Sequence, residues 1–199
     1  MLERLLHKAV AVPGAYDFVQ VVAGSRQVQA RVAARVPVAL APGATVVDVG
    51  GGTGVFRHVW PPSARFVCAD LDPQKLAGFR AKFPGDSAVL ADAALLPFAD
   101  ASVDAVACTL VSHHLPDGAL HQAMSGIARL LRPGGTLLFA DAVWRPARLP
   151  SRLLWRYDRG SFPRPAERLR EAIASQLSIQ HWETFAVWHR YVVCVATRA

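Results

Sequence analysis

The residues V-V-D-V-G-G-G-T-G-V-F, at positions 46–56, decide the fold of this 199-residue chain. A short β-branched run is interrupted by Asp48 and is followed by four glycines within five positions, namely Gly50, Gly51, Gly52 and Gly54. Each glycine costs about 0.5–1 kcal/mol relative to alanine inside regular structure. The cluster therefore predicts a sharp backbone turn, or a partner that approaches the backbone more closely than a Cβ atom allows.

The rest of the chain alternates strand-like and helix-like segments. Apolar, β-branched runs at 44–49, 64–69, 87–90, 103–110 and 136–140 are separated by helical patterns, which is typical of a parallel sheet in an open α/β fold. The last two runs, near 178–187 and 190–197, are separated by too few residues for a crossover. They must therefore pair antiparallel. These features predict a mostly parallel sheet that is completed by an antiparallel pair.

The glycine cluster lies where an open α/β sheet binds ligands, at the carboxyl end of a strand. Backbone N–H groups at the start of the following helix suit a polar or anionic group. A dinucleotide fingerprint reads G-x-G-x-x-G, but Val55 occupies the place of its last glycine. No lysine-serine pair follows, so a triphosphate P-loop is not expected either.

Two further aspartates follow the next two predicted strands. Asp70 lies 22 residues after Asp48, the place of an acid that accepts both ribose hydroxyls, and Asp92 can accept from the exocyclic amine of an adenine. A lone aspartate at a strand end is more often a turn or cap residue. Three of them at the ends of successive parallel strands favour a ligand that contains adenosine.

At this point the chain resembles the class I S-adenosylmethionine-dependent methyltransferases, especially the ubiquinone/menaquinone-biosynthesis-like branch (methyltransferase type 11). The matching motifs run in family order from 46 to 135: V-V-D-V-G-G-G-T-G, C-A-D-L-D-P, A-D-A-A-L-L-P-F-A-D-A-S-V-D-A-V, S-H-H-L and R-L-L-R-P-G-G. The resemblance implies a Rossmann-like open three-layer sandwich with a seven-stranded, mostly parallel sheet whose last strand is antiparallel.

The expected organisation is a single methyltransferase domain over residues 1–199. It would consist of N-terminal helices (1–40), a cofactor-binding core (44–143), a cover on the acceptor side (144–164), and a last helix with the antiparallel strand pair (165–199).

The resemblance also implies the cofactor, S-adenosyl-L-methionine, with S-adenosyl-L-homocysteine as its product. Asp48 and the turn from Gly50 to Gly54 would approach the methionine part of the cofactor. The other implied contacts are Asp70 and Leu71 at the ribose and adenine, Asp92 and Ala93 at the adenine amine, Cys108 and Thr109 beside the sulfonium, and Tyr16 at the cofactor carboxylate.

Two histidines follow the fourth predicted strand, where the acceptor is expected. Methyl transfer needs a base only if the nucleophile carries a proton, and the pKa range of histidine suits that role. His113 and His114 are the candidate catalytic residues, with His114 preferred; the alternative is that they pack or cap the loop. The sequence T-L-V-S-H-H replaces the amine-methylating (Asn/Asp/Ser)-Pro-Pro-aromatic signature, so base methylation in nucleic acids is not expected. The prediction is a small organic acceptor, methylated on carbon or oxygen.

A basic segment lies between the fifth strand and the last helix. Between Arg145 and Arg170 the chain has eight arginines, against Asp158 and Glu167. This segment can meet a carboxylate, a diphosphate, an acyl-carrier protein or an anionic membrane surface, or it can be a solvated face. Its aromatic residues can wall an apolar substrate; they are Trp144, Trp155, Tyr157 and Phe162.

Two other functions remain open at this point. One is a protein that binds S-adenosylmethionine or S-adenosylhomocysteine without transferring a methyl group. The other is a lipid or RNA methyltransferase that uses the basic segment 145–170. The oligomeric state is not indicated.

The cysteine positions and the hydropathy pattern indicate the cellular compartment. Cys68, Cys108 and Cys194 each lie in an apolar run without metal or redox spacing, so free buried thiols and no metal site are expected. No window has the ~18 uninterrupted apolar residues of a membrane span, and no signal peptide is evident. The sequence therefore predicts a cytoplasmic protein.

Overall fold

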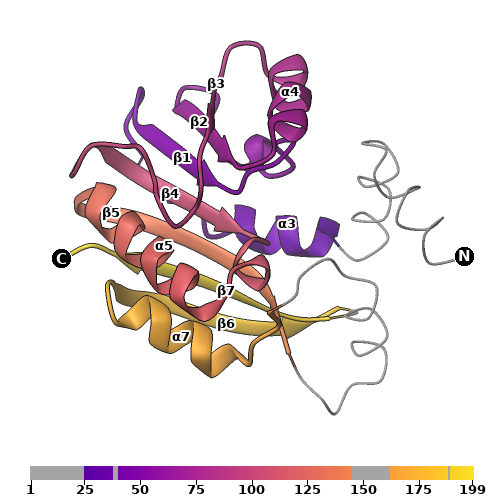
Figure 1. The fold of residues 1–199 in the computed structure, drawn as a ribbon, viewed down its shortest axis with the longest axis vertical. Helices are drawn as coiled ribbons and strands as arrows, with labels where there is room; N and C mark the ends of the chain where they lie inside the picture. The colour runs from indigo at the N-terminus through magenta and orange to yellow at the C-terminus, as the bar shows by residue number, and fades with distance from the viewer. Residues whose placement is uncertain (1–24, 38–39, 145–161, 188) are drawn as a thin grey trace, which may run out of the picture.

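The computed structural model describes residues 25–37, 40–144, 162–187 and 189–199, which form a seven-stranded sheet with helices on both faces (Figure 1). The strands are β1 (Thr45–Val49), β2 (Arg65–Asp70), β3 (Ser87–Leu90), β4 (Val103–Thr109), β5 (Leu131–Val143), β6 (Ser178–Ala186) and β7 (Arg190–Thr197). The α-helices are α3 (Ser25–Ala33), α4 (Pro73–Lys82), α5 (Asp117–Leu130) and α7 (Ala166–Ala174), and two short 3-10 turns are η1 (Arg57–Val59) and η2 (Ser112–His114).

The strand order is β3-β2-β1-β4-β5-β7-β6. Strands β3, β2, β1, β4 and β5 pair in parallel, whereas β7 pairs antiparallel with both of its neighbours, β5 and β6. The predicted class, a Rossmann-like sheet with its last strand antiparallel, is confirmed. The order reverses between β1 and β4, so the crevice beyond their carboxyl ends is where this topology places a ligand.

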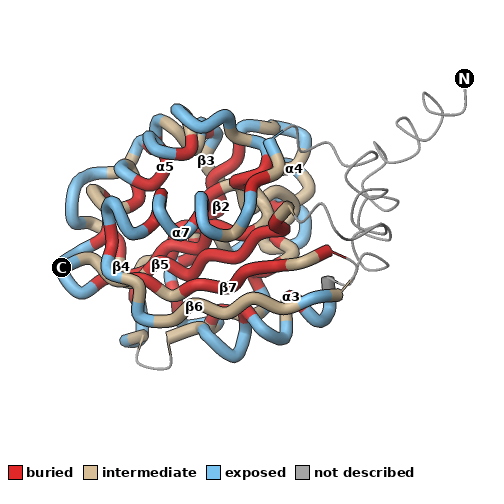
Figure 2. The backbone as a smooth tube through the Cα atoms, turned by 90° about the horizontal axis from the view of Figure 1, so that it is seen from below, coloured by how far each residue is buried: buried red, intermediate tan, exposed pale blue. Residues whose placement is uncertain are grey.

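Two apolar layers cover the two faces of the sheet. On one face α5 and α7 contribute Leu120, Met124, Ile127, Leu169 and Ile173, and on the other α3 and α4 contribute Val28, Val32, Leu76 and Phe79. Figure 2 shows the buried strands between exposed helix surfaces. The apolar positions of α5 recur at three- and four-residue intervals, which buries one stripe of the helix against the sheet. The three-layer sandwich is therefore also confirmed.

Two local expectations differ from the structure. The fifth strand runs over Leu131–Val143 rather than 136–140, because Leu131 pairs with Val103 and a register shift at that pair accommodates Pro133 and Gly134. Between the first two strands, where the alternating pattern predicts a helix, the structure has only the 3-10 turn η1. Here Gly54 has a positive φ of 80° and donates to the carbonyl of Gly51, so the chain turns before a helix can begin.

Several expected features fall outside the described residues. These are the N-terminal segment before Ser25, which includes Tyr16, and most of the acceptor-side cover, which includes Trp155 and Tyr157. Within the described part of the chain, no helix is long and apolar enough to cross a membrane.

Candidate functional site

The glycine turn lies at the carboxyl end of β1 and is bound to the end of β2. The Gly50 N–H donates to the carbonyl of Ala69 (2.7 Å), and the Gly52 N–H donates to Oδ2 of Asp70 (2.9 Å). Gly50 and Gly52 have positive φ values of 70° and 57°, a region that side-chain-bearing residues rarely adopt. The turn therefore needs glycine for its backbone conformation alone.

The space available for a Cβ atom differs among the four glycines, and this distinguishes those needed for packing from the one that leaves room for a ligand. A Cβ atom on Gly50 would collide with Val111, and one on Gly54 would lie 2.6 Å from Cδ2 of Phe79. A Cβ atom on Gly51 would lie 2.6 Å from Oδ2 of Asp48. At Gly52 the nearest atoms would be at ordinary contact distances, 3.6 Å to Lys75 and 3.8 Å to Asp70. Three glycines thus serve the protein's own packing, and Gly52 has room beside the Asp70 carboxylate.

Asp48 is a buried carboxylate that the described protein does not satisfy. Only 1% of its surface is exposed, and neither carboxylate oxygen has a hydrogen-bond partner among the described residues. Burial, and after it the charge of Asp70, raises the pKa of Asp48 from 3.8 to about 8. A buried acceptor without a donor costs about 1–3 kcal/mol, so this position is suited to a donor or a cation that is not part of the described chain.

Asp70 organises the end of β2. Its Oδ1 accepts from the N–H of Asp72 (2.9 Å), and its Oδ2 accepts from Gly52. Asp72 in turn caps α4 by accepting from the N–H groups of Gln74 and Lys75, with Pro73 at the first helical position. Each oxygen of Asp70 keeps acceptor capacity, since a carboxylate offers about four lone-pair sites.

The side chains beyond β2 and β3 are more exposed. Leu71 is 68% exposed directly after Asp70, and the pairing of Asp70 with Leu90 places the ends of the two strands side by side. Asp92 is exposed and accepts from the N–H of Ala94 (2.8 Å), the turn geometry expected of a lone aspartate, while Ala93 is half-buried.

The end of β4 lies between two carboxylates. Cys108 and Thr109 are buried, and the pKa of the Cys108 thiol is raised by burial and then by the charges of Asp141 and Asp48. The next residue, Leu110, has a φ of 57°, an outlier for a side-chain-bearing residue. Such strain persists only where the surroundings impose it, and it often marks a functional site.

Asp141 on β5 is the site residue that the sequence reasoning missed. It is fully buried, and its Oδ1 lies 2.5 Å from Nδ1 of His113 and 2.7 Å from the N–H of Ala142. Its Oδ2 accepts from the Ser112 hydroxyl and from the N–H of His113 (3.1 Å). Burial alone would raise the pKa of Asp141, but the His113 charge and hydrogen bonds from His113, Ser112 and Ala142 hold it below its ordinary value.

The structure thus brings together η2, where His113 and His114 lie, and the end of β5. His113 is buried and His114 is exposed, and their ring centroids are 4.1 Å apart. An available signal was the apolar run T-L-L-F-A before Asp141, which is the same strand-then-aspartate pattern that identified Asp48 and Asp70.

Arg164, the last residue of the acceptor-side cover (144–164), binds this segment to the η2 loop. Its guanidinium, itself buried, donates to Oδ1 of Asp117 (2.6 Å) and to the carbonyls of Ser112 (2.9 Å) and Leu115 (2.5 Å). The N–H of Phe162 donates to the carbonyl of His113 (3.0 Å). The backbone of η2 is therefore held from both β5 and the 162–164 segment.

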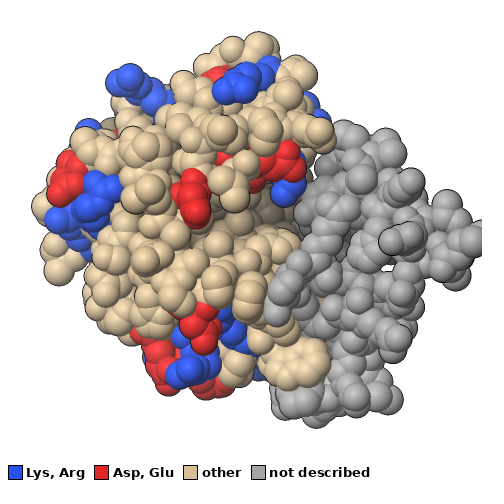
Figure 3. Space-filling model, in the orientation of Figure 1, with Lys and Arg blue, Asp and Glu red and all other residues tan. Residues whose placement is uncertain are grey.

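Charge elsewhere on the molecule is mixed. Figure 3 shows acidic and basic side chains interspersed mostly around the rim of one face, with a few acidic side chains also toward its middle. No group of three or more His, Cys, Asp and Glu residues that could hold a metal ion occurs in the part of the chain that the structure describes.

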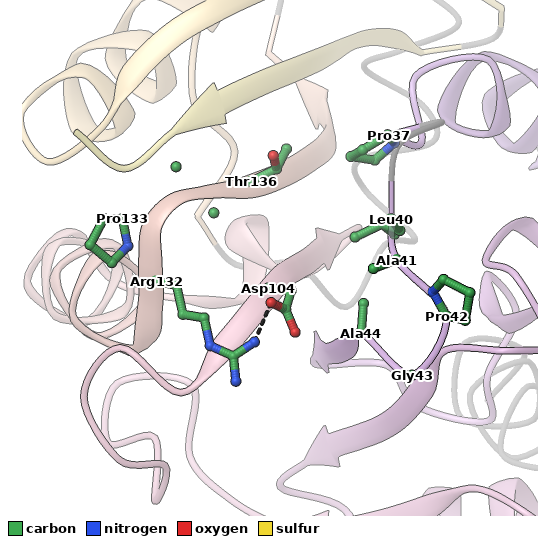
Figure 4. A pocket seen from close by; sticks show the side chains of 12 residues that line it. Pro37, Leu40, Ala41, Pro42, Gly43, Ala44, Asp104, Arg132, Pro133 and Thr136 are labelled. Atoms are coloured by element: carbon green, nitrogen blue, oxygen red, sulfur yellow. Dashed lines mark hydrogen bonds and ion pairs between the residues drawn. The ribbon is translucent and has the colours of Figure 1, made fainter.

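A cavity of about 510 Å³ lies at the opposite edge of the sheet, beside the amino ends of β1 and β4 and the start of β5. Figure 4 shows the Asp104–Arg132 ion pair on one side of it and Leu40 and Pro42 on the other. This cavity is distant from the glycine turn, because it lies at the amino ends of β1 and β4, whereas the glycine turn follows the carboxyl end of β1. It contributes nothing to the candidate site.

Comparisons with known proteins agree with this geometry. The family model described as "Methyltransferase domain" matches residues 47–139, which run from β1 through most of β5. An uncharacterized methyltransferase of Mycobacterium sp. (strain JLS) is 35% identical over 103 residues, covering 51% of this chain and 40% of that protein. A malonyl-[acyl-carrier protein] O-methyltransferase of Serratia marcescens is 34% identical over 100 residues, 50% of this chain and 38% of that protein. The chain therefore spans less than half the length of these curated relatives.

Solved structures share the fold over a longer stretch. A chain from the complex between the Haloferax volcanii Trm112 methyltransferase activator and a methyltransferase has a TM-score of 0.77 at 22% identity, over 96% of both chains. The geranyl diphosphate C-methyltransferase of Streptomyces coelicolor A3(2), solved with Mg²⁺, geranyl diphosphate and S-adenosyl-L-homocysteine, has a TM-score of 0.72 at 15% identity, over 87% of this chain and 77% of that one.

Proposed function

We propose that this chain, whose residues 47–139 match the methyltransferase-domain family, is a class I S-adenosylmethionine-dependent methyltransferase of type 11 that transfers the methyl group of S-adenosyl-L-methionine to carbon or oxygen of a small organic acceptor. S-adenosyl-L-homocysteine would be the second product. The observation that carries the proposal is Asp48, a buried carboxylate beneath a glycine turn at the switch point of the sheet, neither of whose oxygens has a hydrogen-bond partner among the described residues.

The residues of the site fit this cofactor. Asp48, whose oxygens have no donor among the described residues, would accept a hydrogen bond from the amino-acid end of the cofactor, and a cationic group there would favour its ionised form. Gly52 leaves room for that end of the cofactor above the turn. The proposed contacts of the remaining residues are Asp70 with Leu71 at the ribose and adenine, Asp92 with Ala93 at the adenine amine, and Cys108 with Thr109 beside the reacting methyl group.

When bound, the cofactor supplies an activated methyl group on a sulfonium with a neutral leaving group. The chain's own task is then alignment and exclusion of water, for which proximity alone can supply several kcal/mol. Cys108 and Thr109 are buried at the end of β4 and would help to exclude water from the reacting methyl group. His113 and His114, in η2, would border the acceptor.

The proposed acceptor is a small molecule, with quinol-like, phenolic and polyketide-like compounds as the classes to test. A structural neighbour named for C-methylation of geranyl diphosphate supports a small acceptor, whereas a relative is named for O-methylation of a malonyl group on an acyl-carrier protein. The names of these proteins therefore leave both the acceptor and the methylated atom open.

Calorimetry with S-adenosyl-L-homocysteine tests the site through a matched pair of variants. Gly52→Val and Gly43→Val both place a β-branched residue at a positive φ, 57° and 79°, but Gly43 lies at the amino end of β1 with open space around it. We expect Gly52→Val to abolish binding and Gly43→Val to retain it. Equal affinities of the two variants would refute the proposed site, and no binding by the wild-type protein at high micromolar cofactor would refute the function.

A screen for S-adenosyl-L-homocysteine release separates an enzyme from a cofactor-binding protein without transferase activity. Quinols, phenols and polyketide-like compounds are the acceptors, and mass spectrometry detects both products. A lipid or RNA methyltransferase that uses the segment 145–170 predicts instead a steep salt dependence of partner binding.

A further inference from the structure

The contact between Asp141 and His113 fixes where the proton of a neutral His113 ring resides. An ionised carboxylate only accepts hydrogen bonds, and its Oδ1 lies 2.5 Å from Nδ1. The proton of the neutral imidazole is therefore on Nδ1, and the lone pair that can take a proton is on Nε2. The role of each ring nitrogen follows from this pairing.

Asp141 is built to remain charged. Four donors reach its two oxygens: Nδ1 of His113, the hydroxyl of Ser112, and the N–H groups of His113 and Ala142. Hydrogen bonds to the charged form stabilise a carboxylate even when it is buried. A charged Asp141 would stabilise the imidazolium that forms when Nε2 takes a proton, as the acid of a catalytic triad does.

The pair is adjacent to the candidate cofactor site. Val111, the residue before η2, occupies the space that a side chain on Gly50 would need. Cys108 on β4 is influenced by the charges of both Asp48 and Asp141. Among the described residues, other titratable or charged groups around the η2 loop include His114 in the same turn, Arg164 from the segment before α7, and Asp117 at the start of α5.

We propose that Asp141, assisted by Ser112, is a positioning residue that holds His113 as the base of the methyl transfer, so that the natural acceptor attacks through an atom that carries a proton. This rests on the proposed function. It selects His113 over His114, because the buried carboxylate contacts the His113 ring.

The step balances without a further reagent. As the acceptor oxygen or carbon forms its bond to the methyl carbon, the methyl–sulfur bond breaks with its electron pair going to sulfur. The proton of the acceptor passes to Nε2 of His113, and solvent removes it afterwards. A phenol, quinol or enol fits this chemistry, whereas a carboxylate acceptor is already ionised at neutral pH and gains nothing from a base.

NMR of the ¹⁵N-labelled imidazole rings tests the proposal without needing an acceptor. In the wild-type protein we expect the neutral His113 ring to carry its proton on Nδ1. We expect Asp141→Asn to lower the proton affinity of His113 about tenfold or more, since a neighbouring charge has been removed. A proton on Nε2, or a titration of His113 that is unchanged in Asp141→Asn, would overturn the proposal. If Asp141→Asn does not fold, the position of the proton on the neutral His113 ring of the wild-type protein still tests the proposal.

Asp104→Asn is the matched control, because Asp104 lies on β4 at the opposite edge of the sheet and pairs with Arg132. It should leave the His113 titration unchanged. Calorimetry with S-adenosyl-L-homocysteine separates the two proposals. If the wild-type protein binds the cofactor product but the neutral His113 ring carries its proton on Nε2, the role of His113 as a base is refuted and the proposed function stands.

Acceptor probes give the second measurement. His113→Gln should reduce methylation of phenol and quinol probes roughly 10²-fold or more, with unchanged cofactor affinity, as expected for loss of a general base. Methylation of a carboxylate probe alone, at a rate that His113→Gln does not change, would contradict the proposal.

Discussion

Two buried aspartates lie near the carboxyl ends of strands on either side of β4, Asp48 on β1 and Asp141 on β5, and they differ in their hydrogen-bond partners. Asp48 on β1 is 1% exposed and has no hydrogen-bond partner among the described residues, whereas Asp141 on β5 is 0% exposed and has four donors. Their pKa values accordingly shift in opposite directions, Asp48 upward because of burial and Asp141 downward because its hydrogen bonds and the His113 charge outweigh burial.

The difference teaches how one strand-end pattern serves two purposes. A carboxylate that the protein leaves unsatisfied is destabilising until a ligand supplies the missing donor, so its position marks a binding site. A carboxylate that the protein satisfies completely is part of the internal architecture, and it can act on another side chain. The following predictions test that contrast, beginning with the largest effect.

Asp141→Ala should lower the free energy of unfolding by about 3–5 kcal/mol, because it leaves His113 and Ser112 without their buried partner. The melting temperature should fall by about 2–4 °C for each kcal/mol in a chain of this size. Chemical denaturation measures the change. A loss below about 1 kcal/mol would show that the donors around Asp141 contribute little to stability.

Asp48→Asn should have the opposite effect on the cofactor-free protein. Asp48 has a raised pKa of about 8, so it must take up a proton to be buried at neutral pH; asparagine avoids that cost and should increase the free energy of unfolding. Cofactor affinity should fall roughly 10- to 100-fold, because the carboxylate that would accept from the cofactor is lost. Thermal unfolding and calorimetry measure the two quantities. Unchanged affinity would mean that Asp48 does not face the cofactor.

The pH dependence of stability should separate the two carboxylates. Because the pKa of Asp48 is about 8 in the folded chain and 3.8 ordinarily, its contribution is fully favourable below about pH 3.8 and is lost as the pH rises toward 8. The pKa of Asp141 is lowered, so its contribution is present above the ordinary value and is lost as the pH falls through the folded value.

Urea unfolding of the cofactor-free protein between about pH 2 and 8 tests this difference, since the loss attributed to Asp141 occurs below its ordinary pKa of 3.8. In Asp48→Asn the decline in stability with rising pH should become shallower, while the loss in acid should persist. An identical slope in wild type and variant would contradict the raised pKa of Asp48.

The smallest effect is expected at an exposed pair. Asp100, whose side chain is 74% exposed, pairs with Arg129 at 2.5 Å on the surface. Asp100→Ala should cost about 1 kcal/mol or less, because solvent screens exposed ion pairs. This variant is therefore the control for removing an aspartate, and a larger loss would show that burial is not what distinguishes Asp48 and Asp141.

Much of the fold was predictable from local pattern. The β-branched runs of β1, β2 and β4 and the interval between β6 and β7 were sufficient to give the parallel sheet and its antiparallel end, because buried parallel strands read as continuous apolar runs. The start of β5 was not predictable, since Pro133 and Gly134 read as a helix stop and only the pairing of Leu131 with Val103 shows a strand there.

The candidate site was predictable in part. Asp48, Asp70 and the glycine turn follow from a motif whose chemistry is local in sequence. The same strand-then-aspartate pattern precedes Asp141, but its contact with His113 could not be predicted, because the two residues are 28 apart and meet only after β4 and β5 have paired. The sequence offers no local signal that distinguishes His114 from His113 as the candidate base, because both histidines lie in one turn and only their packing differs.

The sequence by itself determined the alternation of strands and helices, the antiparallel end of the sheet and the glycine turn, because these depend on residue type at fixed spacing. Only the tertiary structure decided which buried carboxylate is satisfied and which is not. That outcome depends on donors from other elements, Ser112 and His113 for Asp141 and none from the described chain for Asp48. Hydrogen-bond satisfaction is a property of packed neighbours, and no single segment encodes it.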